Sequence, residues 1–214
     1  MPGEASDISQ LLKEPGLSVP HANTCDSALQ RLIESATQGD AAAFEEIMIR
    51  YERRVLKTAW RMLGSREDAQ DAAQEVFLRV FKYLKSYRGT QDFEGWLYRI
   101  IVNACRDIAR KRTPPGASRY HAEGPAADLA GIAAAGDLEE SAIQSQQRTI
   151  ITQALATLSR KEREALVLRD LEGFSTKEVA RMLGSSQITV RSHISSARKK
   201  IKLFKDRLMK RRRG

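Results

Sequence analysis

The side chains with the clearest chemical capability lie near the C-terminal end of the chain, where hydroxyl, amide and cationic groups share one short stretch. They are Gln187, Thr189, Arg191, Ser192, Ser195, Ser196, Arg198 and Lys199. Arginine and amide side chains can hydrogen-bond to base edges in the DNA major groove, and cations can bind phosphates. This stretch therefore predicts recognition of duplex DNA rather than catalysis.

A second set of side chains combines aromatic rings, an amide and several cations. It consists of Tyr87, Arg88, Phe93, Trp96, Tyr98, Arg99, Asn103, Arg106 and Arg110. Aromatic rings can stack on unpaired bases while neighbouring cations hold the phosphates, so these residues could bind single-stranded nucleic acid. Packing in a hydrophobic core is the alternative interpretation of the aromatic members.

A third set is acidic and lies on one face of an expected helix, at Asp68, Asp71, Gln74 and Glu75. Carboxylates and an amide on one helix face can bind a basic, largely helical partner. A face that only contacts solvent is the alternative.

Motifs for catalysis and metal binding are absent from the sequence. It contains no phosphate-binding lysine loop, no His-Glu-x-x-His pair and no nucleophile elbow, and its three histidines are scattered. Cys25 and Cys105 are too few for a disulfide framework or a zinc site of their own. We therefore expect no cofactor, no metal, no small-molecule substrate and no enzymatic activity.

These side chains must be positioned by helices. Apolar residues at spacings of three and four predict helices over 40–63, 65–84 and 93–112. In the second of these we expect Phe77 and Phe81 to face inward together with Val76 and Val80. The outer face of the third helix is expected to carry the following residues: Tyr98, Arg99, Asn103, Arg106 and Arg110.

The C-terminal third contains a helix-turn-helix pattern. Two helices are predicted between 141 and 169, with a capping signal at Ser159. A short helix then precedes Gly184, which permits a tight turn, and a second helix follows. This helix packs through Val190, Ile194, Ala197 and Ile201, which leaves its polar side for a major groove. The fold class predicted is all-α.

The chain has 214 residues and a net charge of +9, and residues 148–214 alone carry +12. This excess favours binding to a polyanion. Composition suggests five segments: a disordered extension (1–35), a helical domain (36–112), a flexible linker (113–137), a second helical domain (138–206) and a basic tail (207–214). The tail fits nucleic-acid binding and simple solubility equally well.

Neither a secretory signal nor a membrane-length apolar run is found, so we expect a cytoplasmic protein without membrane insertion.

Three motifs in this order resemble the extracytoplasmic-function (ECF) sigma factors, which are compact members of the bacterial sigma-70 family. The motifs are Glu67–Phe77, Trp96–Ile100 with Asn103, and the helix-turn-helix ending in Thr189–Ser192. Ile188 departs from the family pattern, which often has glycine there, and His193 replaces a second basic residue.

The resemblance implies a two-domain factor that binds core RNA polymerase and promoter DNA, both duplex and single-stranded. Region 2 of such a factor binds the polymerase clamp helices, here through the acidic face at 68–75. Its third helix and the preceding loop melt the −10 element and capture a flipped base near Tyr87–Phe93 and Asn103. Region 4 reads the −35 element through the stretch 187–199. An anti-sigma partner and a stress or envelope-response regulon are further expectations of the resemblance.

Two other classes of protein remain open at this point. An ordinary activator or repressor could carry the same helix-turn-helix, but it has no reason to carry the Gln74–Glu75 face together with the helix from Trp96 to Asn103. A nucleic-acid-modifying enzyme would need a catalytic constellation, which we do not find.

Overall fold

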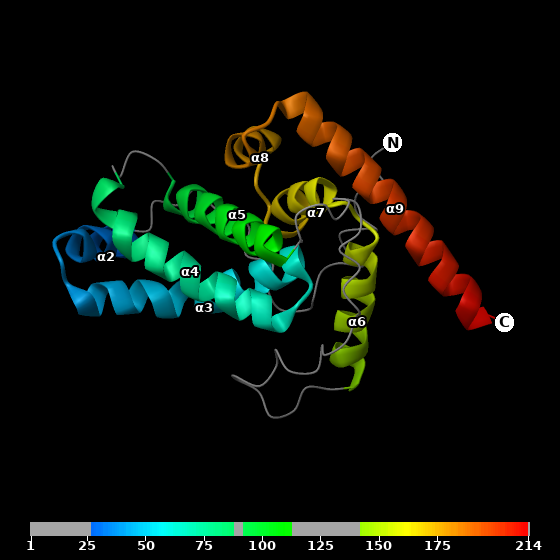
Figure 1. The fold of residues 1–214 in the computed structure, drawn as a ribbon, viewed down its shortest axis with the longest axis horizontal. Coiled ribbons are helices and arrows are strands. Elements are labelled where there is room, and N and C mark those ends of the chain that lie inside the picture. The colour runs from blue at the N-terminus through cyan, green and yellow to red at the C-terminus, as the bar shows by residue number, and fades with distance from the viewer. Residues whose placement is uncertain (1–26, 88–91, 113–141, 214) are drawn as a thin grey trace. The chain divides into compact units, whose positions relative to one another are not determined.

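The computed structural model describes residues 27–87, 92–112 and 142–213, and these residues contain helices and no β-strand. They form two compact units, one built from α2 to α5 and the other from α6 to α9 (Figure 1). The all-α, two-domain expectation is confirmed. Residues 1–26, 88–91, 113–141 and 214 lie outside the described residues, and they include the whole of the expected linker.

The first unit contains α2 (Ser27–Thr37), α3 (Ala41–Leu63), α4 (Arg66–Tyr83), the short 3₁₀ helix η1 (Leu84–Ser86) and α5 (Phe93–Arg112). Helix α2 packs against α3 and η1, and α3 also packs against α5. The expectation of disorder through residue 35 is therefore wrong for residues 27–35. These residues fold because Ile33 and Ala36 share one helix face and are buried.

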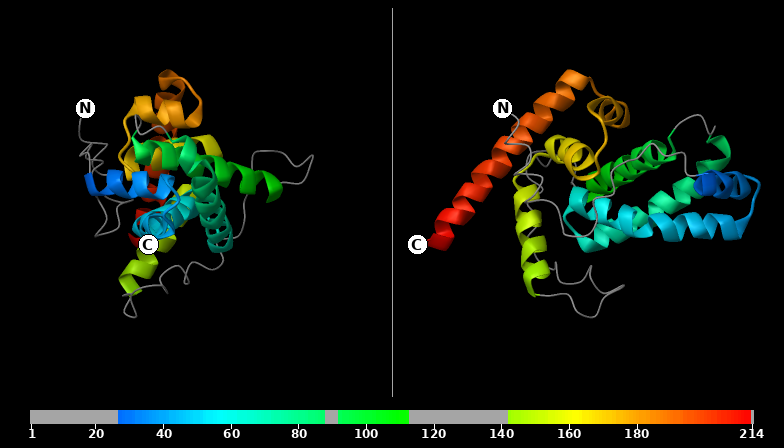
Figure 2. Two further views of the ribbon diagram at one scale, coloured as in Figure 1. Left: turned by 90° about the vertical axis from the view of Figure 1, so that its left-hand side faces the viewer. Right: turned by 180° about the vertical axis from the view of Figure 1, so that it is seen from behind.

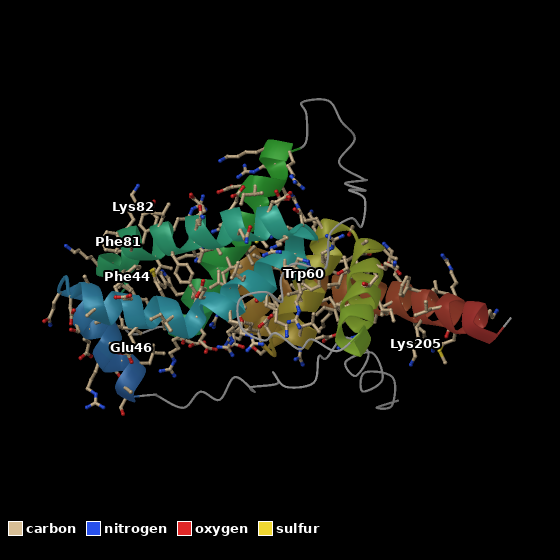
Figure 3. The ribbon with its side chains drawn as sticks, turned by 90° about the horizontal axis from the view of Figure 1, so that it is seen from below. Phe44, Glu46, Trp60, Phe81, Lys82 and Lys205 are labelled. Atoms are coloured by element: carbon tan, nitrogen blue, oxygen red, sulfur yellow. The ribbon has the colours of Figure 1, made fainter. Side chains whose placement is uncertain are left out.

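The core of the first unit follows the predicted helical spacing. Its fully buried members include Ile47, Val55, Ala59, Ala72, Val76, Val80, Leu97, Ile101 and Val102. The inward placement of Phe81 is wrong, because this side chain is 66% exposed. Position 81 lies one residue beyond the buried Val80, which rotates it to the flank of the helix. There its ring makes an edge contact with Phe44, at 5.1 Å between centroids (Figure 3).

The second unit contains α6 (Ala142–Ala156), α7 (Arg160–Leu166), a π-helical turn η2 (Val167–Leu171), α8 (Thr176–Leu183) and α9 (Gln187–Arg213). Capping boxes start α7 at Ser159 and α8 at Ser175, each closed by a glutamate three residues later. Gly184 ends α8 with φ +64°, the left-handed conformation that glycine adopts without a Cβ penalty. The predicted helix-turn-helix is thus present in the second unit.

Helix α9 extends further than the predicted second helix of the motif. It packs on α6, α7 and α8, and its buried stripe is the predicted one of Val190, Ile194, Ala197 and Ile201. Its last turns project beyond the rest of the second unit and include the residues expected to form a basic tail, up to Arg213 (Figure 2). Among the described helices, none has the length and apolar character needed to cross a membrane.

Candidate protein and nucleic-acid interfaces

The acidic set predicted on α4 divides into buried and exposed members. Asp71 and Gln74 are exposed and Glu75 is partly exposed, whereas Asp68 is buried. Burial raises the pKa of Asp68, although an ion pair with Arg112 (2.6 Å) acts in the opposite direction. Asp68 therefore links α4 to the end of α5, and the outward-facing members of this set are Asp71, Gln74 and Glu75.

Glu75 belongs to a charge network that joins α4 to α5. Arg79 contacts Glu75 and Asp107, each at 2.7 Å, and Arg110 also contacts Asp107. Burial alone would raise the pKa of Asp107, but hydrogen bonds from the two arginines outweigh it and the pKa is lowered. The network holds the Glu75 side chain near the surface in a defined orientation.

Two apolar side chains extend the exposed face of α4 beyond the acidic set. Leu78 and Phe81 are each 66% exposed. These two residues follow Asp71 and Gln74 along the helix at spacings of three, four and three, so the four side chains form one row. We call this row the α4 ridge; it consists of Asp71, Gln74, Leu78 and Phe81. Sequence reasoning missed both residues as surface residues. Continuing the outward spacing from Gln74 would have found them.

A groove of about 520 Å³ lies between α4 and α5. The residues that line this α4–α5 groove are Glu75, Leu78, Arg79, Lys82, Tyr83, Trp96, Arg99, Ile100 and Asn103. It therefore brings together three residues of the predicted single-strand set, Trp96, Arg99 and Asn103. Arg99 and Asn103 are exposed and Trp96 is half-buried. An aromatic ring, an amide and cations around one hollow can bind a nucleotide.

Trp96 packs in a cluster of aromatic rings with Tyr87 and Phe93. The ring of Tyr87 lies 5.2 Å from that of Trp96 and 5.6 Å from that of Phe93, and Phe93 and Trp96 are 5.5 Å apart. Phe93 is buried and also contacts Tyr51 at 5.5 Å. Such tilted and edge-on pairs are favourable aromatic geometries. The cluster fixes the orientation of Trp96 at the start of α5.

Other members of the single-strand set are placed differently. Tyr98 is fully buried, so its expected place on the outer face of α5 is wrong. A step of one residue rotates a helical side chain by about 100°, which carries Tyr98 from the Arg99 side into the core beside Leu97. Arg110 is exposed and Arg106 is half-buried, whereas Arg88 lies outside the described residues.

The duplex-binding set on α9 also divides into two groups. Exposed positions are held by Gln187, Thr189, Arg191, Ser192, Ser195 and Lys199. By contrast, Ser196 donates to Glu162 (2.6 Å), and Arg198 donates twice to Asp170 (2.9 and 2.8 Å). The polar atoms of Ser196 and Arg198 therefore hold α9 against α7 and η2.

Glu162 is buried and joins α7 to α9 through several hydrogen bonds. It accepts hydrogen bonds from Lys200 (2.7 Å), from Ser196 and from the N–H of Ser159 (2.8 Å). Burial alone would raise its pKa, but these bonds outweigh burial and lower it to about 2. A capping glutamate of α7 thus also fixes the position of α9.

The first turn of α9 is held by a cap at Ser186. The Thr189 N–H donates to Oγ of Ser186 at 3.0 Å, and the two hydroxyl groups are 2.8 Å apart. The Ser186 hydroxyl thus bonds a backbone N–H of the first turn, which has no partner within the helix. It presents the first exposed side chains of α9 on a rigid turn.

Comparison with known proteins places this geometry in a family. The family model for Sigma-70 region 2 matches residues 47–114, and that for Sigma-70 region 4 matches residues 148–201. The chain belongs to the sigma-70 family of transcription initiation factors, in its ECF group. It is 33% identical to the RNA polymerase sigma-H factor of Pseudomonas aeruginosa over 177 residues, which cover 80% of this chain and 91% of that protein. The ECF RNA polymerase sigma-E factor of Escherichia coli K12 is 32% identical over 175 residues, with the same coverage.

Solved structures show the same fold. CnrH in complex with the cytosolic domain of CnrY matches with a TM-score of 0.61 and 25% identity, covering 84% of this chain and 97% of CnrH. The sigma factor RpoE of Bartonella quintana, in complex with the anti-sigma factor NepR, matches with a TM-score of 0.59 and 21% identity, covering 76% and 96%.

Proposed function

We propose that this chain is a non-catalytic specificity subunit that binds core RNA polymerase and directs it to promoters with defined −10 and −35 elements. The observation that carries the proposal is the presence, in one chain, of an exposed acidic helix face, a nucleotide-sized groove beside it and a separate helix-turn-helix. A cytoplasmic site of action follows, because the polymerase and its promoters are there.

The decisive experiment is runoff transcription with core polymerase on a library of promoters. We expect specific initiation that depends on this protein. An ordinary activator or repressor would instead bind duplex DNA tightly by itself and would confer no promoter-specific initiation on core polymerase.

Polymerase binding is assigned to the α4 ridge and Glu75. Asp71 and Glu75 supply negative charge, and Gln74 supplies hydrogen-bonding groups, toward a basic and largely helical partner surface. Leu78 and Phe81 add exposed apolar area in the same row, of the kind that forms the centre of an interface once it is covered. This combination supports helix-on-helix binding to the clamp helices.

Binding of the −10 element is assigned to the α4–α5 groove. Trp96 would stack on an unpaired base, Asn103 would hydrogen-bond to its edge, and Arg99, Arg106 and Arg110 would hold phosphates. Extruding a base costs a few kcal/mol, and its capture in the groove offsets this cost. Promoter melting would thus be driven by binding free energy and would not require ATP.

Replacing Asn103 by alanine is expected to reduce promoter opening about tenfold, because one hydrogen-bonded base contact contributes roughly 1–3 kcal/mol. The yield of open complexes can be measured by permanganate reactivity of unpaired thymines. The matched control is Gln30→Ala, which removes an exposed amide from α2. Equal opening by both variants would exclude Asn103 from the −10 site.

Binding of the −35 element is assigned to the exposed N-terminal half of α9. We expect Arg191→Ala to weaken specific binding of the holoenzyme by about 1–3 kcal/mol if the guanidinium makes a bidentate base contact. Lys199→Ala should instead weaken binding to all sequences alike, since a phosphate contact carries no sequence information. Competition footprinting with specific and random duplexes separates the two effects, and a footprint insensitive to Arg191→Ala would remove it from the site.

Control by an anti-sigma factor is also proposed. The Bartonella RpoE of similar fold is bound to one, and the exposed apolar residues of the α4 ridge here provide a surface that such a partner could cover. A partner of this kind should compete with core polymerase, so that increasing amounts of it release the chain from the holoenzyme on a sizing column.

A further inference from the structure

Ile188, in the first turn of α9, is an exposed aliphatic side chain that the assignments above do not use. It is 77% exposed, more than Ile49, Leu78 or Phe81. Exposing so much apolar surface on a folded unit gains nothing for its stability. Ile188 lies in the first turn of the helix proposed to read DNA, so this apolar surface would face the major groove.

The helix places Ile188 on the side of α9 that faces away from the core. The buried stripe begins at Val190, whereas Ile188, Ser192, Ser195 and Lys199 follow one another at spacings of four, three and four. Residues at these spacings form one row along a helix. Ile188 is therefore the first residue of the exposed row, and its neighbours Gln187 and Thr189 are rotated to either side of it by about 100°.

Local structure gives the Ile188 side chain a defined direction. The cap at Ser186 holds the first turn through the N–H and hydroxyl of Thr189. A β-branched side chain in a helix has one strongly preferred χ1 rotamer, so little side-chain entropy is lost when it is buried in an interface.

The chemistry of the major groove restricts what such a side chain can contact. Base edges there present hydrogen-bond donors and acceptors together with one apolar group, the C5-methyl of thymine. We propose that Ile188 contacts the methyl group of a thymine in the −35 element and so determines specificity at that base pair. This inference rests on the proposed function and names a further residue of the same DNA-binding surface.

The test compares thymine with uracil, which differ at this position by a single methyl group. Duplexes carrying the −35 sequence that the holoenzyme selects from a random library are synthesised with deoxyuridine at each thymine in turn. At one position we expect about a fourfold loss of holoenzyme affinity, the effect of one methyl group removed from contact. Ile188→Ala should bind both duplexes equally, and Ile188→Val should keep most of the difference.

The matched control is Leu203→Ala, which removes an apolar side chain that is 54% exposed on the same helix but far from its first turn. It should retain the full thymine preference. The inference alone is overturned if wild-type holoenzyme shows no loss with uracil at any position, or if Ile188→Ala shows the same loss as wild type. Reduced binding by Ile188→Ala to a protein partner, with an unchanged thymine preference, would assign the side chain to that partner instead. A holoenzyme that selects no upstream sequence would overturn the proposed function itself.

Discussion

The substitution Glu75→Lys will strongly weaken the binding of this chain to core RNA polymerase. The substitution puts a cation beside the α4 ridge, on the surface proposed to meet a basic partner. Like charges brought together in an interface cost several kcal/mol, so we expect the affinity to fall by roughly 100-fold or more. The measurement is titration of core polymerase with fluorescently labelled protein, supported by co-purification.

The fold should survive this change, since the ion pair of Glu75 with Arg79 lies at the surface and the Glu75 side chain is 43% exposed. Surface ion pairs contribute about 0–1 kcal/mol to stability. Glu52→Lys is a matched charge reversal at an exposed position of α3 and should bind normally. Gln74→Lys, which introduces the same charge without removing a partner of Arg79, should reproduce the defect. If both α4 variants bind like wild type, the polymerase contacts another face.

Replacing Glu162 by glutamine will lower the free energy of unfolding of the second unit by about 3 kcal/mol at pH 7. The carboxylate is buried and accepts hydrogen bonds from Lys200, Ser196 and Ser159, and glutamine cannot replace the charge. The expected size follows from the pKa of Glu162, which is lowered from 4.5 to about 2, at 1.36 kcal/mol for each pH unit.

The pH dependence of this effect has a definite sign. Since the pKa of Glu162 is lower in the folded state, its stabilising effect is fully present above pH 4.5 and is lost as the pH falls toward 2. Wild type and variant should therefore differ most at neutral pH and converge in acid. Urea unfolding of the full chain at several pH values measures the difference, and hydrogen exchange assigns it to α7 and α9.

Asp206→Asn serves as the control for the Glu162 variant, because Asp206 is an exposed carboxylate on the projecting end of α9. It should change stability by less than about 0.5 kcal/mol. A constant difference between wild type and Glu162→Gln from pH 7 to pH 2 would show that the loss comes from packing and not from the carboxylate charge.

Structural features that depend on residues close together in the sequence could be predicted from the sequence. The turn at Gly184, the cap at Ser159 and the buried stripe of α9 depend on backbone conformation and side-chain spacing within a few residues, and all three are present. The helix at residues 27–37 carries the same kind of signal in its apolar spacing, although the composition of residues 1–35 as a whole favours disorder.

The sequence by itself determined the helices from residue 40 to the linker, the helix-turn-helix and the chemical types of the side chains available for binding. Only the tertiary structure decided which of them face outward. Phe81 was expected to be buried and is exposed, whereas Tyr98 was expected to be exposed and is buried. Both lie at the edge of a helix face, where burial depends on how the neighbouring helices pack. Ser196 and Arg198 are bound to Glu162 and Asp170, which lie 34 and 28 residues earlier. No local pattern reveals such partners, because the contact exists only after the helices have come together.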